Sequence, residues 1–190
     1  MLRVNRILCN ILATALEFAA LSSGKIGAIS YGQLTSTYAI SSSSTYLDFG
    51  LQATITPTAA GSSFIVIPSV CSSANTGANA GFHFALYRKI NAGSFSKIDY
   101  FTGDAASSRN RGLFAGGTDG GAPWTQESSS THVLDNATSG LSYSLGNTIT
   151  YNLHTYSSGT VSVINRSYRD DNTNDDTRTM SSILILEVLA

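Results

Sequence analysis

The chain has 190 residues, of which 42% are hydrophobic and 12% are charged, and its formal net charge at pH 7 is −1. This length suffices for one domain, or for one domain with a tail. A near-neutral chain without a basic cluster is unlike proteins that bind nucleic-acid backbones. The charged fraction is about half of the usual share of roughly 25%. Hydroxyl and amide side chains replace the missing charges, which is typical of extracellular β-proteins and of virion proteins.

The two cysteines, Cys9 and Cys71, lie in different settings. The first belongs to an amphipathic segment at the start of the chain, and the second stands at the end of a predicted strand. Two cysteines so placed do not indicate a disulfide framework, and we expect two free thiols.

Residues 1–21 form the one segment with a helical pattern. The segment is too short and too polar to span a bilayer. We therefore expect an attachment helix or arm over residues 1–23, followed by a jelly-roll domain over residues 24–190. One seam of the helix carries an apolar residue every three or four positions, as in helices that pack against a partner: Val4, Leu8, Ile11, Ala15 and Phe18.

A secretory signal is a second interpretation of this segment, because Arg3 and Arg6 precede an apolar run. Asn10, Thr14 and Glu17 interrupt that run, and no Ala-x-Ala cleavage site follows. A flexible arm is the third interpretation. A helix of two heptads is marginal in water, so contacts with a partner would have to stabilise it.

From residue 24 onward the pattern changes to short strands separated by turns. Strands spaced in this way predict an all-β, antiparallel jelly-roll sandwich. The chain has no internal repeat, which excludes a propeller or a solenoid. Pro68 falls within one predicted strand and requires a bulge or an edge position there. The predicted strands are 25–40, 46–55, 63–71, 81–89, 132–135, 148–156, 160–167 and 181–190, with residues 94–101 as a further candidate for a short strand.

The last of these strands is apolar on both faces, and such a strand must be covered on both. Since the chain stops there, we expect one face in the sandwich core and the other against copies of the chain, in a trimeric or similar assembly. We predict that Ile183, Ile185 and Leu189 need this covering. We expect Ile185→Asp to disrupt the assembly, because a carboxylate buried without water at the axis between copies costs several kcal/mol. One face carries Ile183, Ile185, Glu187 and Leu189, and the other carries Leu184, Leu186 and Val188.

No catalytic constellation emerges from the sequence. His83, His132 and His154 lie on separate predicted strands without the spacing of metal ligands. A G-x-S-x-G elbow is absent, so a serine hydrolase has no support. We predict that the protein is not an enzyme and has no catalytic residues, cofactor or metal, so glycoside and ester substrates should show no turnover.

The irregular stretch 90–131 is long for a compact domain, and loops of this length are usually functional. Glycosidases use a pair of carboxylates. The stretch contains Asp104, Asp119 and Glu127, but no pair of them stands out, so they give glycosidase chemistry only weak support.

The same stretch contains two arginines and the only tryptophan of the chain. Arg109 and Arg111 could bind an anion or a sugar, although we expect salt bridges to a neighbouring subunit. Trp124 could stack on a sugar or cover a seam between subunits.

A polar loop, residues 170–176, offers oxygen ligands that would suit Ca²⁺. Its spacing is not that of an EF-hand, and such a loop is more often a solvated turn. Calcium binding is therefore kept only as the alternative interpretation. The sequence also contains two glycosylation sequons, 136–138 and 165–167, which matter only in a secreted eukaryotic chain. The loop carboxylates are Asp170, Asp171, Asp175 and Asp176.

The order of several segments resembles a known family. The segments are 55–66 (ITPTAAGSSFIV), 84–88 (FALYR), 107–111 (SSRNR), 165–167 (NRS) and 177–188, which leads into and includes most of the last strand. Over residues 24–190 the chain is similar to the small jelly-roll modules, like tumour necrosis factor and the complement globular head, that are frequent in phage virion proteins. The resemblance implies a homotrimer whose last strand lies near the threefold axis. It also implies a knob on the outer surface of a virion, with a structural rather than an enzymatic role.

Three functions remain open. The first is a trimeric structural protein on a phage surface, either a capsid decoration (cement) protein or a short knob. The second is the receptor-binding tip of a tail fibre, which would bind a host-surface carbohydrate. The third is a secreted signalling jelly roll with residues 1–23 as its signal. The missing shaft favours the first over the second, and the missing cleavage site weighs against the third.

The expected partners follow from the first two functions. They are further copies of the chain, a major capsid or tail protein, and a host-surface glycan, with no nucleic acid and no membrane span. We expect residues 1–21 to fasten the knob to the particle, because their apolar seam matches no helical stripe elsewhere in the chain.

Overall fold

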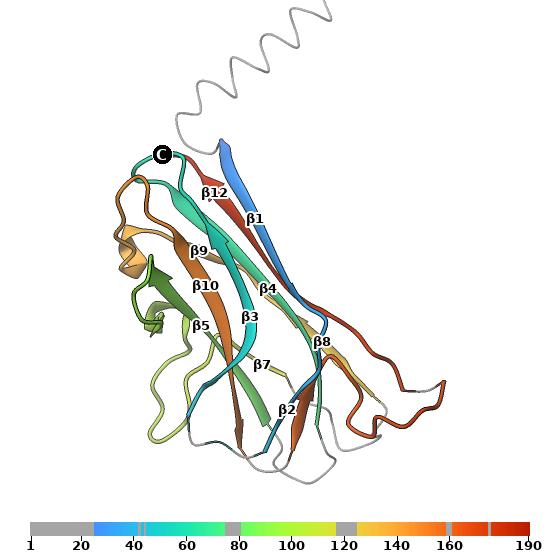
Figure 1. The fold of residues 1–190 in the computed structure, drawn as a ribbon. Helices are drawn as coiled ribbons and strands as arrows, with labels where there is room; N and C mark the ends of the chain where they lie inside the picture. The colour runs from blue at the N-terminus through green and yellow to red at the C-terminus, as the bar shows by residue number, and fades with distance from the viewer. Residues whose placement is uncertain are drawn as a thin grey trace, which may run out of the picture.

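The computed structural model of the chain describes residues 25–41, 43, 45–74, 81–116, 125–158, 161–174 and 176–190. Over these residues the protein is all-β, with two antiparallel sheets packed into a sandwich, which confirms the predicted fold class at this level (Figure 1). The predicted helix over residues 1–21 lies outside the described residues. Within them, no helix is long and apolar enough to cross a membrane.

The larger sheet has seven strands in the described part of the chain, in the order β1-β12-β4-β11-β2, with β8 and β9 also paired to β4. The last strand runs between β1 and β4, and the Leu189 N–H donates to the Lys25 carbonyl at 2.8 Å. The end of the described chain therefore lies beside its beginning (Figure 1). The strands are β1 (Ile26–Leu34), β2 (Tyr38–Ile40), β4 (Ser63–Ala74), β8 (Glu127–Ser130), β9 (Val133–Asp135), β11 (Ser162–Ile164) and β12 (Ser181–Val188).

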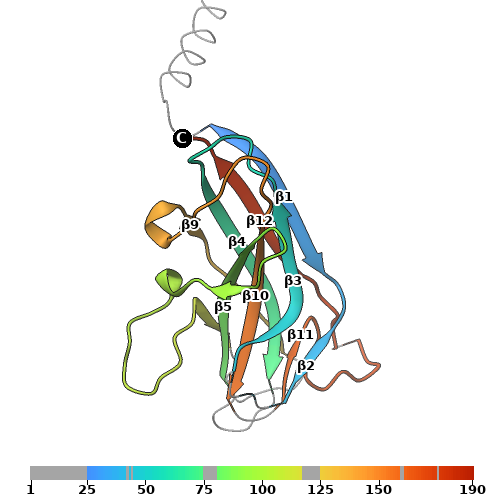
Figure 2. The same cartoon turned by 60° about the vertical axis from the view of Figure 1, so that its left-hand side comes forward.

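The second sheet has five strands among the described residues, in the order β3-β10-β5-β6, with β7 also paired to β5. Two 3₁₀ turns, η1 (Asp99–Phe101) and η2 (Ala137–Ser139), lie outside the sheets. Figure 2 shows β1 next to β3 along one side of the sandwich. The strands are β3 (Leu47–Ile55), β5 (Gly81–Ile90), β6 (Ser96–Lys97), β7 (Phe114–Gly116) and β10 (Ile149–Ser158).

The core lies between the two sheets and follows the period-two alternation of the strands. In β3, for example, Phe49, Leu51, Ala53 and Ile55 are buried while the residues between them are exposed. Full burial of one large apolar side chain contributes roughly 1.5–3 kcal/mol. The largest fully buried apolar side chains are Leu51, Phe64, Phe84, Leu86, Ile149, Tyr151, Leu153, Ile164, Ile183 and Ile185.

The position of β12 corrects one prediction. Ile183 and Ile185 are fully buried within a single chain, because they point between the two sheets. The expectation that a copy of the chain must cover them is therefore wrong, and Ile185→Asp would disrupt the fold rather than test an interface. The face of β12 that stays partly exposed carries Leu184, Leu186 and Val188.

Pro68 lies in the middle of β4 rather than at a sheet edge. On one side it is opposite Ile183 of β12, and on the other it faces the break, residues 131–132, between β8 and β9. The predicted irregularity takes the form of this interruption, because proline has no N–H to donate to a neighbouring strand.

Close packing of β1 on β3 depends on Gly32. A Cβ atom at this position would overlap the carbonyl oxygen of Gln52. Nearby, the Ser30 hydroxyl donates to the Thr54 carbonyl at 2.7 Å. The inner face of β1 thus closes one side of the sandwich by direct approach to the β3 backbone.

Candidate interaction surfaces

The three histidines do not come together in the structure. His83 lies on β5 and His154 on β10, whereas His132 lies in the break between β8 and β9 of the other sheet. Burial lowers the pKa of both His83 and His154, so both rings are neutral at pH 7. Among the described residues, no group of three His, Cys, Asp or Glu side chains is arranged to hold a metal ion.

The described carboxylates of the loop 170–176, those of Asp170, Asp171 and Asp176, are paired with arginines. Asp176 also accepts a hydrogen bond from the Ser167 hydroxyl at 2.7 Å. A cation would have to displace these partners, so the arrangement favours a structural turn over a calcium site. Asp175 lies outside the described residues. The closest ion pairs are Arg169–Asp176 at 2.8 Å, Arg178–Asp170 at 2.8 Å and Arg169–Asp171 at 3.2 Å.

Arg111 holds its own loop together. Its Nε donates to the Gly103 carbonyl at 2.6 Å. Its carbonyl oxygen accepts hydrogen bonds from the Tyr46 hydroxyl and the Lys97 ammonium group, each at 2.9 Å. Arg109 is exposed beside it. The arginine pair predicted to meet an anion or a subunit therefore contains one residue with a local structural role.

The carboxylates of the long stretch lie on different segments where they are described. Asp104 is exposed in the loop before β7, and Glu127 is half-buried on β8. Asp119 and Trp124 lie outside the described residues.

Cys71 is a free thiol, half-buried on β4. Its Sγ lies 3.4 Å from the side-chain oxygen of Gln126. Cys9 lies outside the described residues.

Asn165 has a structural role that the sequence did not indicate. Its side chain is fully buried, and its φ of 62° lies in the left-handed region. Its amide group donates to the carbonyls of Leu34 at 2.8 Å and Ser36 at 3.0 Å, and its oxygen accepts from the Ser181 hydroxyl at 2.6 Å. An amide enclosed in this way is not accessible for glycosylation in the folded chain.

A buried ion pair connects the two sheets, and sequence reasoning missed it. Asp135 on β9 is fully buried, and its Oδ2 lies 2.6 Å from Arg88 Nη1 on β5. The Tyr151 and Ser139 hydroxyls donate to the same carboxylate at 2.6 and 2.5 Å. Arg88 also donates to the Gly140 carbonyl at 2.8 Å. No short-range pattern signals this pair, because its partners are 47 residues apart.

Glu187 on β12 occupies a core-facing position and is fully buried. Its carboxylate accepts hydrogen bonds from the N–H groups of Ala28, Thr58 and Ala59 at 2.8–3.1 Å and from the Thr58 hydroxyl at 2.7 Å. Burial alone would raise the pKa of Glu187, but these hydrogen bonds, with one from Ser62, outweigh it and lower the pKa to about 2. The hydrogen bonds of the Glu187 carboxylate connect β12 to the start of β1 and to the turn between β3 and β4.

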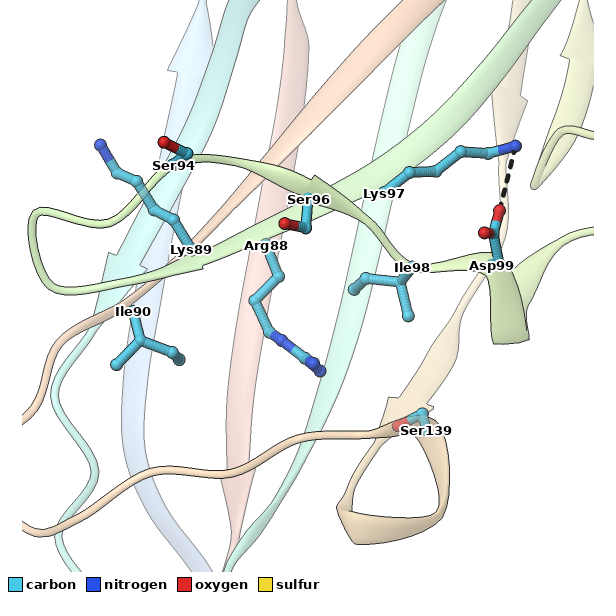
Figure 3. A pocket seen from close by; sticks show the side chains of 9 residues that line it. All are labelled: Arg88, Lys89, Ile90, Ser94, Ser96, Lys97, Ile98, Asp99 and Ser139. Atoms are coloured by element: carbon cyan, nitrogen blue, oxygen red, sulfur yellow. Dashed lines mark ion pairs between the residues drawn. The ribbon is translucent and has the colours of Figure 1, made fainter.

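A cavity of about 260 Å³ opens beside Arg88 (Figure 3). The Arg88 guanidinium points toward Ser139, whereas Lys89 and Lys97 extend in other directions (Figure 3). Lys97 is paired with Asp99 at 3.3 Å. Because Arg88 is already engaged by the buried carboxylate, we assign no ligand to this cavity.

The outward face of the larger sheet carries an apolar surface. Its residues lie side by side in rows across β1, β12, β4 and β9. The most exposed members are Ile29 at 63%, Tyr31 at 52%, and Ile26 and Leu134 at 48% each. Large contiguous apolar patches are more common at interaction sites than elsewhere on soluble monomers. The rows are Ile26 and Val188; then Ile29, Leu186, Ile65 and Leu134; then Tyr31, Leu184 and Ile67. The row beyond is polar and contains Gln33, Ser182, Ser69 and Ser130.

In comparisons with known proteins, no protein-family model matches the chain, and no curated protein matches it.

Proposed function

We propose that the protein is a homotrimeric structural knob with a jelly-roll fold on the outer surface of a phage virion, acting as a capsid decoration protein. The strand order supports the jelly-roll topology. Along the chain, β1 and β2 lie in the larger sheet, β3 in the smaller, β4 in the larger, β5 to β7 in the smaller, β8 and β9 in the larger, β10 in the smaller, and β11 and β12 in the larger. Connections that cross between two sheets in this way are expected in a jelly roll.

The apolar surface of the larger sheet is the observation that carries the proposal. None of its nine residues is charged, so two copies can meet there without burying an ion. Each large apolar side chain contributes roughly 1.5–3 kcal/mol when it is fully removed from water. A second copy of the chain is therefore the occupant that we propose. The number three comes from the resemblance to trimeric jelly-roll heads, which is an argument by analogy.

The virion location is supported by composition and by the resemblance. A chain with only 12% charged residues, in which hydroxyl and amide side chains replace the missing charges, fits a particle surface. A decoration protein works by assembly and attachment, and this role requires no catalytic group.

Ile29→Asp is expected to convert the trimer into monomers at micromolar concentration. The carboxylate would be buried between copies, and an uncompensated buried charge costs several kcal/mol. Because Ile29 is 63% exposed in a single chain, the free energy of unfolding of the monomer should change by less than about 0.5 kcal/mol. Light scattering of the full chain measures the mass.

Gln33→Asp is the matched control, since Gln33 is an exposed residue on the same face of β1 in the adjacent polar row. It should leave the trimer intact, and Leu186→Asp should repeat the effect of Ile29→Asp from β12. A monomeric wild-type protein, or an Ile29→Asp variant with the wild-type mass, would show that the surface does not hold copies together.

Attachment through residues 1–21 makes a separate prediction. A chain that lacks residues 1–23 should still form a folded trimer in solution but should be absent from purified particles. Its presence on particles would move the docking surface onto the sandwich. A mature particle protein that begins near residue 24 would instead identify the segment as a cleaved signal.

A further inference from the structure

The outer face of the smaller sheet carries a continuous strip of six aromatic rings, which we call the ring strip. Neighbouring ring centroids lie 3.7–6.4 Å apart along its length. Its members, in spatial order, are Phe95, His154, Tyr87, Tyr46, Tyr156 and His83.

Strand alternation places these rings outside the sandwich. On β10, Tyr151 and Leu153 are in the core, so His154 and Tyr156 point away from it. On the neighbouring β5, Phe84 and Leu86 are in the core, so His83 and Tyr87 point outward as well. Five of the six rings are half-buried, and only His154 is buried. The strip therefore presents ring surface to solvent.

Some buried hydrogen-bonding atoms in and beside the strip have no partner among the described residues. The His154 ring stacks on Tyr87 at 3.7 Å, and within the part of the chain that the structure describes neither of its nitrogens has a hydrogen-bond partner. Beside it on β10, Asn152 is fully buried, and its side-chain oxygen has no partner among the described residues either. Buried polar atoms are usually paired, so their presence here needs an explanation.

The charges around the strip are balanced. Lys89 lies over the Phe95 ring at 4.6 Å, and Lys97 lies over the Tyr46 ring at 5.1 Å. Lys97 is paired with Asp99, and the exposed Asp48 accepts a hydrogen bond from Asn152 at 2.9 Å. Single-stranded nucleic acid binds aromatic platforms inside positively charged grooves, and such a groove is missing among these residues.

Tyr46 adds no charge of its own. Burial, with the neighbouring phenols of Tyr87 and Tyr156, raises the pKa of Tyr46 to about 12, so its hydroxyl stays neutral at physiological pH. The ligand that fits combines flat apolar faces with many hydroxyl groups and little charge. A pyranose ring has these properties, since its C–H face stacks on aromatic rings and its rim forms hydrogen bonds.

We propose that the ring strip binds a neutral polysaccharide along the outer face of the smaller sheet. The ligand chain runs across β5 and β10, with successive sugar rings over Phe95, Tyr87 and Tyr156. The strip lies on the opposite sheet from the apolar surface, so binding does not depend on the proposed trimer.

The test is affinity electrophoresis of the full chain in native gels that contain dextran, soluble starch, laminarin or galactomannan. We expect at least one of these neutral polysaccharides to retard the wild-type protein. Phe95→Ala and Tyr87→Ala should each weaken binding by about tenfold, because each removes one stacking platform. Phe95→Tyr keeps a ring and should keep binding.

Tyr100→Ala is the matched control, because Tyr100 is a 62% exposed aromatic residue on η1 that does not belong to the strip. It should bind as the wild type does. Ile29→Asp should also bind, which separates this proposal from the assembly proposal. Phe95→Ala carries the test by itself if Tyr87→Ala fails to fold, since Phe95 lies in the turn before β6.

Three results would overturn the proposal. They are no retardation by any of the four polysaccharides, equal retardation of Phe95→Ala and the wild type, and tighter binding of poly(dT) or of a polyuronate than of the neutral polymers. The second result would mean that the rings only shield the outer face of β10.

Discussion

Asp135→Ala is expected to lower the free energy of unfolding by about 3–5 kcal/mol, because it leaves the Arg88 guanidinium largely buried without its counter-charge. The variant also removes the acceptor for the Tyr151 hydroxyl, which is fully buried. Burial, together with the Asp135 charge, holds the pKa of Tyr151 well above its usual value, so Tyr151 is a donor at all physiological pH values. Urea denaturation at pH 7 measures the loss.

Two controls separate the ion pair from a general effect of substitution. Asp104→Ala removes an exposed carboxylate and should change the free energy of unfolding by less than about 0.5 kcal/mol. The double variant Arg88→Met/Asp135→Leu should recover much of the loss, because an apolar pair can replace a buried ion pair. A loss below about 1 kcal/mol for Asp135→Ala would show that solvent reaches the pair.

Glu187→Gln is expected to cost about 2–4 kcal/mol at pH 7. The carboxylate accepts hydrogen bonds from Ala28, Thr58 and Ala59. Hydrogen bonds to a charged group are worth about 1.5–3 kcal/mol. In the variant, the NH₂ group of the new Gln side chain would face backbone N–H groups that need an acceptor. The effect should appear as a lower free energy of unfolding without a change of fold.

The contribution of Glu187 depends on pH in one direction. Its pKa is about 2 in the folded chain against an ordinary value of 4.5, so the unfolded chain binds more protons between these values. The stabilisation is therefore complete above about pH 4.5 and is lost as the pH falls toward 2. The difference in free energy of unfolding between wild type and Glu187→Gln isolates this residue from other carboxylates. We expect that difference to shrink between pH 5 and pH 2.5, and a constant difference would mean that Glu187 is not the titrating group.

The sequence by itself determined the longer strands and the class of fold, whereas the short strands β7 and β8 lie in the stretch 90–131 that the sequence predicts to be irregular. Alternation at a period of two is a local property, so Phe49, Leu51 and Ala53 predict a strand with one buried face before any partner is known. The same reasoning predicted that the last strand is covered on both faces, and the structure confirms this for the face of Ile183 and Ile185. The sequence also identified Pro68 as a point where regular pairing is interrupted.

The tertiary structure alone decided what covers each face and which distant groups meet. It placed Ile183 and Ile185 in the core of one chain and left Leu184 and Leu186 on the apolar surface, although both pairs have the same character in the sequence. It joined Glu187 to Ala28, 159 residues earlier.

These contacts depend on strand order and register, because residues far apart in the chain become neighbours only when strands from both ends pair. The ring strip has the same origin, since its six rings come from β5, β10 and the segments before β3 and β6. A single sequence specifies each strand's two faces through local alternation, but it does not state which strands lie side by side.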